Sequence, residues 1–211
     1  MNQLQHAFNL FDEYNQNDPR WIIWKNEVYP QEYAHALMLN EWVLSLQPAS
    51  GEELLLASRC QHIGRWEIPR DSYPDGREAY LKWRKDLAQH HATIAGNLMR
   101  EARYGENQIN RVTEIIFKKR IKQDYEVQIM ENALCLIFLE HQYDDLRLKY
   151  LDEPEKMINI LYRSLLKMDK HGHAIAKLLP YTNDGLNLVI NAIERVEHSA
   201  AVNNIITNKR P

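Results

Sequence analysis

The sequence has few of the residues that interrupt or cross-link a chain. Seven glycines and eight prolines occur in 211 residues, so no low-complexity tract or long flexible linker is expected. The two cysteines, Cys60 and Cys135, lie inside apolar runs and are typical of buried thiols rather than of a disulfide framework. The sequence therefore predicts a compact protein in a reducing, cytoplasmic compartment.

Long apolar stretches and a strong charge of one sign are also missing. No stretch approaches the length of a membrane span, and the first residues resemble no signal segment, so we expect no membrane partner. With 26 basic and 29 acidic residues, the net charge of −3 gives no overall attraction toward nucleic acid. A nucleic-acid partner would need a local basic patch, and the sequence does not define the oligomeric state.

Apolar residues recur at helical spacing along nearly the whole chain. The run from 127 to 139 is apolar almost all round, as in a central helix surrounded by others. Ser50 and Glu53 have the spacing of a capping box that opens a helix. Because no series of strands or internal repeat competes, we predict one all-α helical bundle over residues 1–211. In it, residues 1–20 form an N-terminal helix and turn, and residues 202–211 form a flexible tail.

The residues from 59 to 70 form the most unusual stretch, with one histidine, one tryptophan, one glutamate and three arginines. His62 could bind a metal or transfer a proton near neutral pH. Arg65 and Arg70 could hold a phosphate or carboxylate through two parallel hydrogen bonds. In the structural alternative, Trp66 anchors the core and the arginines pair with surface carboxylates.

Further candidates lie on the apolar faces of other predicted helices. Helical spacing turns His91 inward, where it could serve as a hydrogen-bonded core residue or as a point on which His62 and His35 converge. His35 shares its face with apolar residues. Glu131 and Glu140 stand on the nearly continuous apolar helix. A buried carboxylate there needs a cation of the protein or a metal ion as its partner.

Two basic clusters complete the set of candidates. The run from 118 to 120 ends a helix, where cations complement the helix dipole. Lys119 is in phase with the apolar positions before it, which would turn it toward a carboxylate or an anionic ligand. The segment from 167 to 173, which ends in His173, is too irregular for a metal motif. No phosphate-binding glycine loop, CxxC pair, HExxH motif or nucleophile elbow occurs, which excludes those mechanisms.

The stretch Gln61-His62 through Arg65-Trp66-Glu67-Ile68-Pro69-Arg70 closely resembles a signature of an uncharacterised family of bacterial and fungal proteins, classed as a domain of unknown function. The resemblance covers most of the chain and adds the following residues: Ser72-Tyr73-Pro74, Tyr80 to Arg84, His91, Lys118 to Arg120, Glu131, Cys135 to Glu140, Lys167-Met168 and Gly172-His173. It groups these residues without implying an activity.

A fainter resemblance connects the chain with the HD-domain phosphohydrolases, whose helical core binds a metal through histidines and an aspartate. His35 stands where the first ligand would lie, and Gln61-His62-Ile63-Gly64 is similar to the His-Asp-Ile-Gly segment of that family. The resemblance implies His91 as the later histidine and Glu131 or Glu140 as the final carboxylate. Gln61 and His62 depart from the family's histidine and aspartate, so the fold carries over more readily than the chemistry.

Three hypotheses follow for the function. In the first, an HD-like pocket binds a nucleotide or phosphorylated small molecule and hydrolyses it with a divalent metal. In the second, the same residues bind an anionic ligand, RNA or a protein partner without catalysis, and in the third they form a purely structural polar network. The candidate catalytic residues are His62, Arg65, Glu67, Arg70 and Lys119; the candidate ligand-binding residues are Trp66, Lys118, Arg120 and His173; the candidate metal ligands are His35, His62, His91, Glu131 and Glu140.

Overall fold

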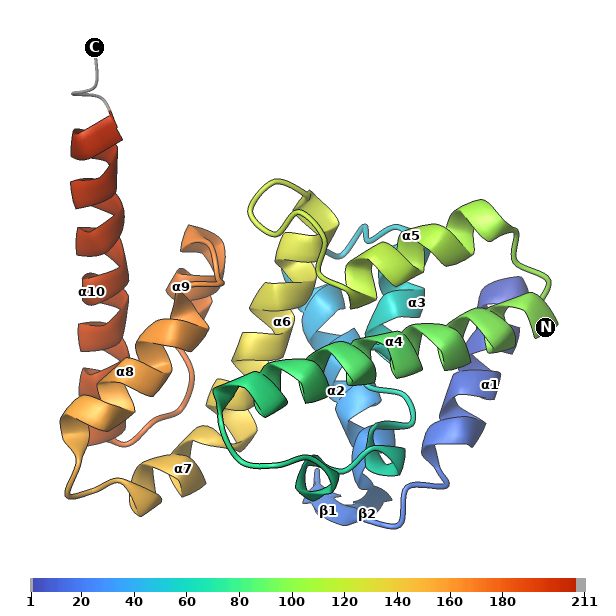
Figure 1. Ribbon diagram of the computed structural model, residues 1–211, viewed down its shortest axis with the longest axis horizontal. Helices are drawn as coiled ribbons and strands as arrows, with labels where there is room; N and C mark the ends of the chain where they lie inside the picture. The colour runs from blue at the N-terminus through green and yellow to red at the C-terminus, as the bar shows by residue number, and fades with distance from the viewer. Residues whose placement is uncertain (1, 208–211) are drawn as a thin grey trace. The chain divides into compact units, whose positions relative to one another are not determined.

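The computed structural model describes residues 2–207, with side chains described through residue 199. The contacts within the chain divide it into two compact units, Met1–Arg120 and Ile121–Pro211. Within the described residues the elements are predominantly helical (Figure 1), which confirms the predicted all-α class.

The first unit contains α1 (Gln3–Asn15), β1 (Trp21–Trp24), β2 (Glu27–Pro30), α2 (Gln31–Leu46), α3 (Glu52–Cys60), η1 (Arg65–Glu67), η2 (Arg70–Ser72), α4 (Arg77–Glu101) and α5 (Glu106–Ile116). The second contains α6 (Tyr125–His141), α7 (Tyr143–Lys149), α8 (Pro154–Leu165), α9 (Lys170–Ala176) and α10 (Asn183–Thr207).

Helix α3 lies at the centre of the contacts within the first unit. It contacts α1, α2 and α5, and α4 in turn contacts α1 and α5. Leu54, Leu56 and Ala57 of α3 are fully buried, as expected for a helix with neighbours on several sides. The end of α3 is therefore fixed by packing, and the turn that follows it starts from a rigid support.

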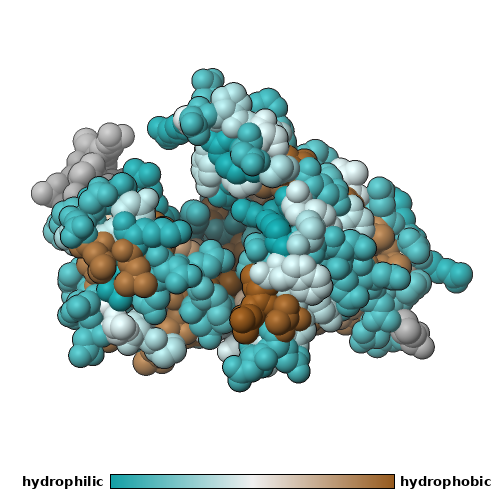
Figure 2. All heavy atoms as spheres, turned by 90° about the horizontal axis from the view of Figure 1, so that it is seen from below, coloured by the Kyte–Doolittle hydropathy of each residue, from teal (hydrophilic) through white to brown (hydrophobic). Residues whose placement is uncertain are grey.

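The aromatic segment before α2 forms a β-hairpin, which the sequence analysis did not anticipate. Strands β1 and β2 pair antiparallel with Trp24 opposite Glu27, and Lys25 and Asn26 between them both have positive φ angles, as in a two-residue type I′ turn. Trp21 and Val28 remain largely exposed. A compact hydrophobic patch is visible on the lower face of the molecule in Figure 2. The base of the hairpin leads directly into the first turn of α2.

The start of α3 differs from the predicted capping box. Gly51 occupies the N-cap position without a side-chain hydrogen bond, and the Ser50 hydroxyl donates to the carbonyl of Gln47 instead. Glu52 and Glu53 lie in the first turn, where negative charge complements the helix dipole. The predicted cap was therefore wrong in its hydrogen bonds, although the helix begins close to where the sequence placed it.

In the second unit, α6 contacts α9, and α8 contacts α10. Most of α6 is buried, in agreement with its apolar sequence. Helix α10 continues through Thr207, so residues 202–207 of the predicted tail are helical, and residues 208–211 lie outside the described residues. No helix among residues 2–207 has the length and apolarity needed to cross a bilayer.

A buried amide holds the turn before α9 against α6. The Asn132 side chain donates to Asp169 Oδ1 at 2.9 Å and accepts the backbone N–H of Asp169 at 3.1 Å. Gly172 packs so closely here that an added Cβ would lie 2.8 Å from the Asn132 side chain. These contacts give a structural role to Asp169 and Gly172 in the 167–173 segment, which the sequence analysis singled out as a candidate cluster.

Replacement of Asn132 by alanine should lower the free energy of unfolding by about 1–3 kcal/mol, because the backbone N–H and carboxylate of Asp169 lose a buried partner. Urea denaturation followed by circular dichroism measures the change. The matched control is Asn187→Ala on α10, where the side chain is exposed and helix propensity alone predicts an unchanged or slightly higher stability. Equal stabilities of the two variants would contradict a structural role for Asn132.

Candidate functional site

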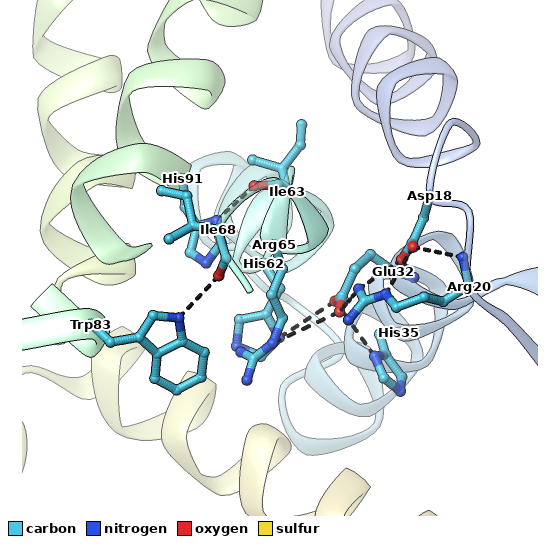
Figure 3. Close-up of polar contacts among 10 residues, drawn as sticks. All are labelled: Asp18, Arg20, Glu32, His35, His62, Ile63, Arg65, Ile68, Trp83 and His91. Atoms are coloured by element: carbon cyan, nitrogen blue, oxygen red, sulfur yellow. Dashed lines mark hydrogen bonds and ion pairs between the residues drawn. The ribbon is translucent and has the colours of Figure 1, made fainter. Parts of the chain in front are cut away.

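The candidate site of the first unit is built around a buried carboxylate, that of Glu32. Six charged or titratable side chains gather there and are called the Glu32 cluster: Asp18, Arg20, Glu32, His35, His62 and Arg65. Figure 3 shows them pointing toward one another from the turn after α1, the first turns of α2 and the turn after α3. Three segments distant in sequence therefore contribute to one polar centre.

Asp18 and Arg20 fix the position of Glu32. The Asp18 carboxylate accepts the backbone N–H of Glu32 at 3.0 Å, which satisfies one of the free donors at the start of α2. Arg20 donates two hydrogen bonds to Asp18, at 2.9 and 2.8 Å, and one to Glu32 Oε1 at 2.9 Å. Although burial would raise the pKa of Asp18, hydrogen bonds from Arg20 and from the Glu32 N–H hold it below its ordinary value.

Two imidazoles face the other oxygen of this carboxylate. Nδ1 of His35 lies 3.5 Å from Glu32 Oε2, and Nδ1 of His62 lies 3.9 Å from it. Glu32 Oε2 is buried and accepts no hydrogen bond. A carboxylate oxygen without a donor in a buried site is costly, so it is suited to accept a proton or to bind a group that enters the site.

His62 is placed by the end of α3. Gly64 adopts a left-handed conformation with φ of 69°, which ends the helical turn and brings His62 and Arg65 to the same side as Glu32 (Figure 3). Burial lowers the pKa of His62 well below its ordinary value, and the positive charges of Arg65 and Lys118 contribute in the same direction. His62 is therefore neutral near pH 7 and can accept a proton or bind a ligand atom.

His91 supports this turn from α4. Its Nδ1 lies 2.6 Å from the carbonyl oxygen of Ile63, and because a carbonyl only accepts, the proton must be on Nδ1. Burial lowers the pKa of His91 to about 4, so Nε2 carries a lone pair at neutral pH. The rings of His91 and His62 lie 5.9 Å apart, which makes His91 a neighbour of the cluster.

Arg65 is half-buried over an aromatic ring. Its Cζ lies 5.4 Å from the ring centre of Trp83, whose indole N–H donates to the carbonyl of Ile68 at 2.9 Å (Figure 3). The Arg65 Nε is 3.9 Å from Glu32 Oε1. Burial lowers the pKa of Arg65, and the positive charges of Arg84 and Arg20 add to this effect, although Glu32 opposes it.

Glu67 and Arg70, predicted as catalytic, contact other partners. Glu67 accepts a hydrogen bond from the Tyr14 hydroxyl at 2.7 Å and lies 3.0 Å from His90 Nε2. Arg70 donates to the carbonyl oxygens of Tyr73 and Pro74, each at 2.9 Å. Both contacts hold the segment after α3 in place, so these two side chains position the site.

Arg70 also borders an open depression of about 490 Å³. The depression is lined by Pro69, Arg70, Asp71, Tyr73 and Asp75, and no member of the Glu32 cluster lines it. The Arg70 guanidinium there already donates to the backbone carbonyls of Tyr73 and Pro74. The concentration of charged and titratable groups at the Glu32 cluster is therefore a better indication of a binding site than the depression.

The other predicted residues of the first unit lie around this centre. Trp66 is half-buried, with its ring 5.9 Å from that of Tyr14. Lys119 and Arg120 are exposed and form ion pairs with Glu114 at 3.9 and 3.2 Å. Lys119 was expected to point inward, but Lys118 is the lysine whose charge acts on His62. Lys118 has a positive φ angle, and helical phase does not extend through such a turn.

Glu131, Glu140 and His173 belong to the second unit. Glu131 is buried, and Glu140 lies 3.2 Å from His141 Nε2. His173 Nε2 contacts the carbonyl oxygen of Leu165 at 2.8 Å. A shared site between these residues and His62 stays a prediction.

The sequence analysis missed Glu32, Arg20 and Asp18. A glutamate in the first turn of a helix complements the helix dipole whether it is buried or exposed, so the pattern alone gave no reason to select it. The nearest signals were the turn-forming Asp18-Pro19 after the first helix and Pro30 at the start of the next one. Burial and the meeting of the two segments are visible only in the structure.

The fold and the site define an all-α protein with a buried carboxylate surrounded by basic groups. Residues 5–189 match the family described as "Domain of unknown function (DUF4202)", so the chain belongs to that family. No curated protein and no solved structure shows significant similarity to the chain. The predicted resemblance to an uncharacterised family of unknown function is thereby confirmed.

Proposed function

We propose that this protein binds a phosphorylated small molecule or nucleotide at the Glu32 cluster. The observation that carries the proposal is the placement of Arg65 and the neutral His62 beside the buried carboxylate of Glu32, where the positive charges of Arg65 and Lys118 both act on His62. The other carboxylate of the cluster, Asp18, is already matched by Arg20 through two hydrogen bonds. A phosphate group would supply negative charge and hydrogen-bond acceptors where cations are concentrated.

Thermal denaturation in the presence of nucleotides and sugar phosphates tests this proposal. A ligand at a hundredfold excess over its Kd should raise the melting temperature by about 5–10 °C, because it binds only the folded state. Arg65→Gln should remove most of this shift. The matched control is Arg100→Gln, which removes the same charge from an exposed ion pair with Glu106 and should keep the full response.

Two results would contradict the proposal. In one, no phosphorylated compound changes the melting temperature of the unaltered protein. In the other, Arg65→Gln responds as strongly as Arg100→Gln, which would show that the compound binds elsewhere.

Hydrolysis of the bound phosphate ester is a second candidate function, favoured by the geometry at Glu32 Oε2. This oxygen lacks a hydrogen bond and faces His35 and His62, so the group can take a proton from an attacking water. If the site is catalytic, Glu32→Gln should slow phosphate release by about 10²–10⁴-fold. Unchanged release in that variant, or none from any bound ester, would leave binding alone as the function.

The HD-like resemblance also implies a divalent metal. The described residues contain no group of three or more His, Cys, Asp or Glu side chains that could hold a metal ion, so no step above depends on one. Elemental analysis of protein purified without a chelator tests the metal directly. Stoichiometric metal that is lost in His62→Ala and retained in His90→Ala would support the predicted ligand.

A further inference from the structure

Two aromatic side chains one helical turn apart on α4 form a support beside the Glu32 cluster. The rings of Tyr80 and Trp83 lie 5.8 Å apart. Trp83 is buried and held by its hydrogen bond to Ile68, whereas Tyr80 is exposed. Trp83 is therefore fixed by the core, and Tyr80 extends the aromatic surface toward solvent.

A guanidinium rests on each of these rings. Arg65 lies over Trp83 at 5.4 Å, and Arg84 lies over Tyr80 at 6.0 Å. Nη1 of Arg84 also donates to the Tyr80 hydroxyl at 3.2 Å. Each contact is a cation–π interaction that orients a guanidinium without using a carboxylate.

The two arginines are close enough for their positive charges to act on each other. Besides burial, the charge of Arg84 contributes to the lowered pKa of Arg65. Within the described residues, no ion pair joins Arg84 to a carboxylate, and the carboxylate nearest to Arg65, that of Glu32, also accepts from Arg20. Two like charges held together in this way repel each other, and an anion placed between them would relieve the repulsion.

We propose that Arg65 and Arg84 form a two-armed clamp for the dianion of a phosphate monoester. This inference rests on the proposed function and names the class of ligand and a second binding residue, Arg84. Two guanidiniums can each donate hydrogen bonds to a different pair of phosphate oxygens. A phosphate diester has one charge and fewer free oxygens, so the second guanidinium, that of Arg84, adds less to its affinity.

Isothermal titration with phenyl phosphate and its methyl ester at pH 8 tests the clamp in the full-length protein. At this pH the monoester carries two charges, because its second pKa is about 6. The unaltered protein should bind the monoester roughly tenfold or more tightly than the diester, since a charge-assisted hydrogen bond contributes about that factor. Arg84→Gln should lose about tenfold in affinity for the monoester and little for the diester.

Lys85→Gln is the matched control, because it removes the same charge from the next exposed position of α4. It should keep the preference for the monoester, and Arg84→Lys should fall between the unaltered protein and Arg84→Gln. If both esters bind and Arg84→Gln keeps the full preference, the clamp is wrong although the proposed function stands. If neither ester binds to the unaltered protein, the proposed function fails together with the clamp.

Discussion

Replacement of Arg20 by methionine is expected to lower the free energy of unfolding by about 3 kcal/mol at neutral pH. The substitution leaves two carboxylates without their guanidinium partner, and the side chains of Asp18 and Glu32 are only 0 and 1% exposed. Breaking a buried ion pair from one side costs about 3–5 kcal/mol. We take the lower part of this range because Arg20 is itself 40% exposed and water can replace part of its interaction.

The effect of this substitution should depend on pH. The pKa of Asp18 is lower in the folded protein than its ordinary value, so its ionised form stabilises folding above about pH 4. This stabilisation is lost as the pH falls through the folded-state pKa. The difference between the Arg20→Met variant and the unaltered protein should therefore be largest near pH 7 and should shrink below pH 4.

Urea denaturation at pH 7 and at pH 3 measures both quantities. Lys25→Met is the matched control, because Lys25 and Glu41 form an ion pair in which both side chains are more than half exposed, and such pairs contribute about 0–1 kcal/mol. If Arg20→Met is no less stable than Lys25→Met at pH 7, the Glu32 cluster does not depend on Arg20.

Replacement of Gly64 by alanine should lower the free energy of unfolding by about 2–3 kcal/mol. A left-handed φ of 69° costs an L-residue with a side chain about 1–2 kcal/mol. An added Cβ would also lie 2.5 Å from Ile94 Cδ1 and 3.1 Å from His90 Nε2, so both side chains would have to move. Their displacement adds a packing cost of about 1 kcal/mol.

The control for this substitution is Gly105→Ala. An added Cβ at Gly105 meets no atom within 4 Å, and its φ of −77° is open to any residue. Urea denaturation of both variants should show a change of no more than about 1 kcal/mol at Gly105. Similar stabilities would mean that the turn after α3 relaxes freely, and a rigid placement of His62 and Arg65 would then be wrong.

His62 and Arg65 show how far local sequence could define the candidate site. Their spacing across a helix end placed both in one turn, and the structure brings both to Glu32. Glu67 and Arg70 come from the same stretch but contact Tyr14 and nearby carbonyl oxygens. Sequence proximity could not separate these two pairs, because the direction of each side chain depends on the left-handed turn at Gly64 and on the packing of α1 and α4.

The sequence by itself determined the all-α class and the family. Helical periodicity is a local property, since each apolar face follows from residues three and four positions apart, and the family match follows from the order of residues along the chain. The sequence also placed His62 and Arg65 in one turn at the end of a helix.

The partners of these residues were decided only by tertiary structure. Glu32 lies 30 positions before His62, and their meeting depends on how α2 packs against α3. The position of Arg84 relative to Arg65 depends in the same way on tertiary packing, because that packing places Trp83 beneath Arg65. Burial is a property of the assembled core, so the sequence could not distinguish the buried Glu32 from a glutamate that complements a helix dipole in water.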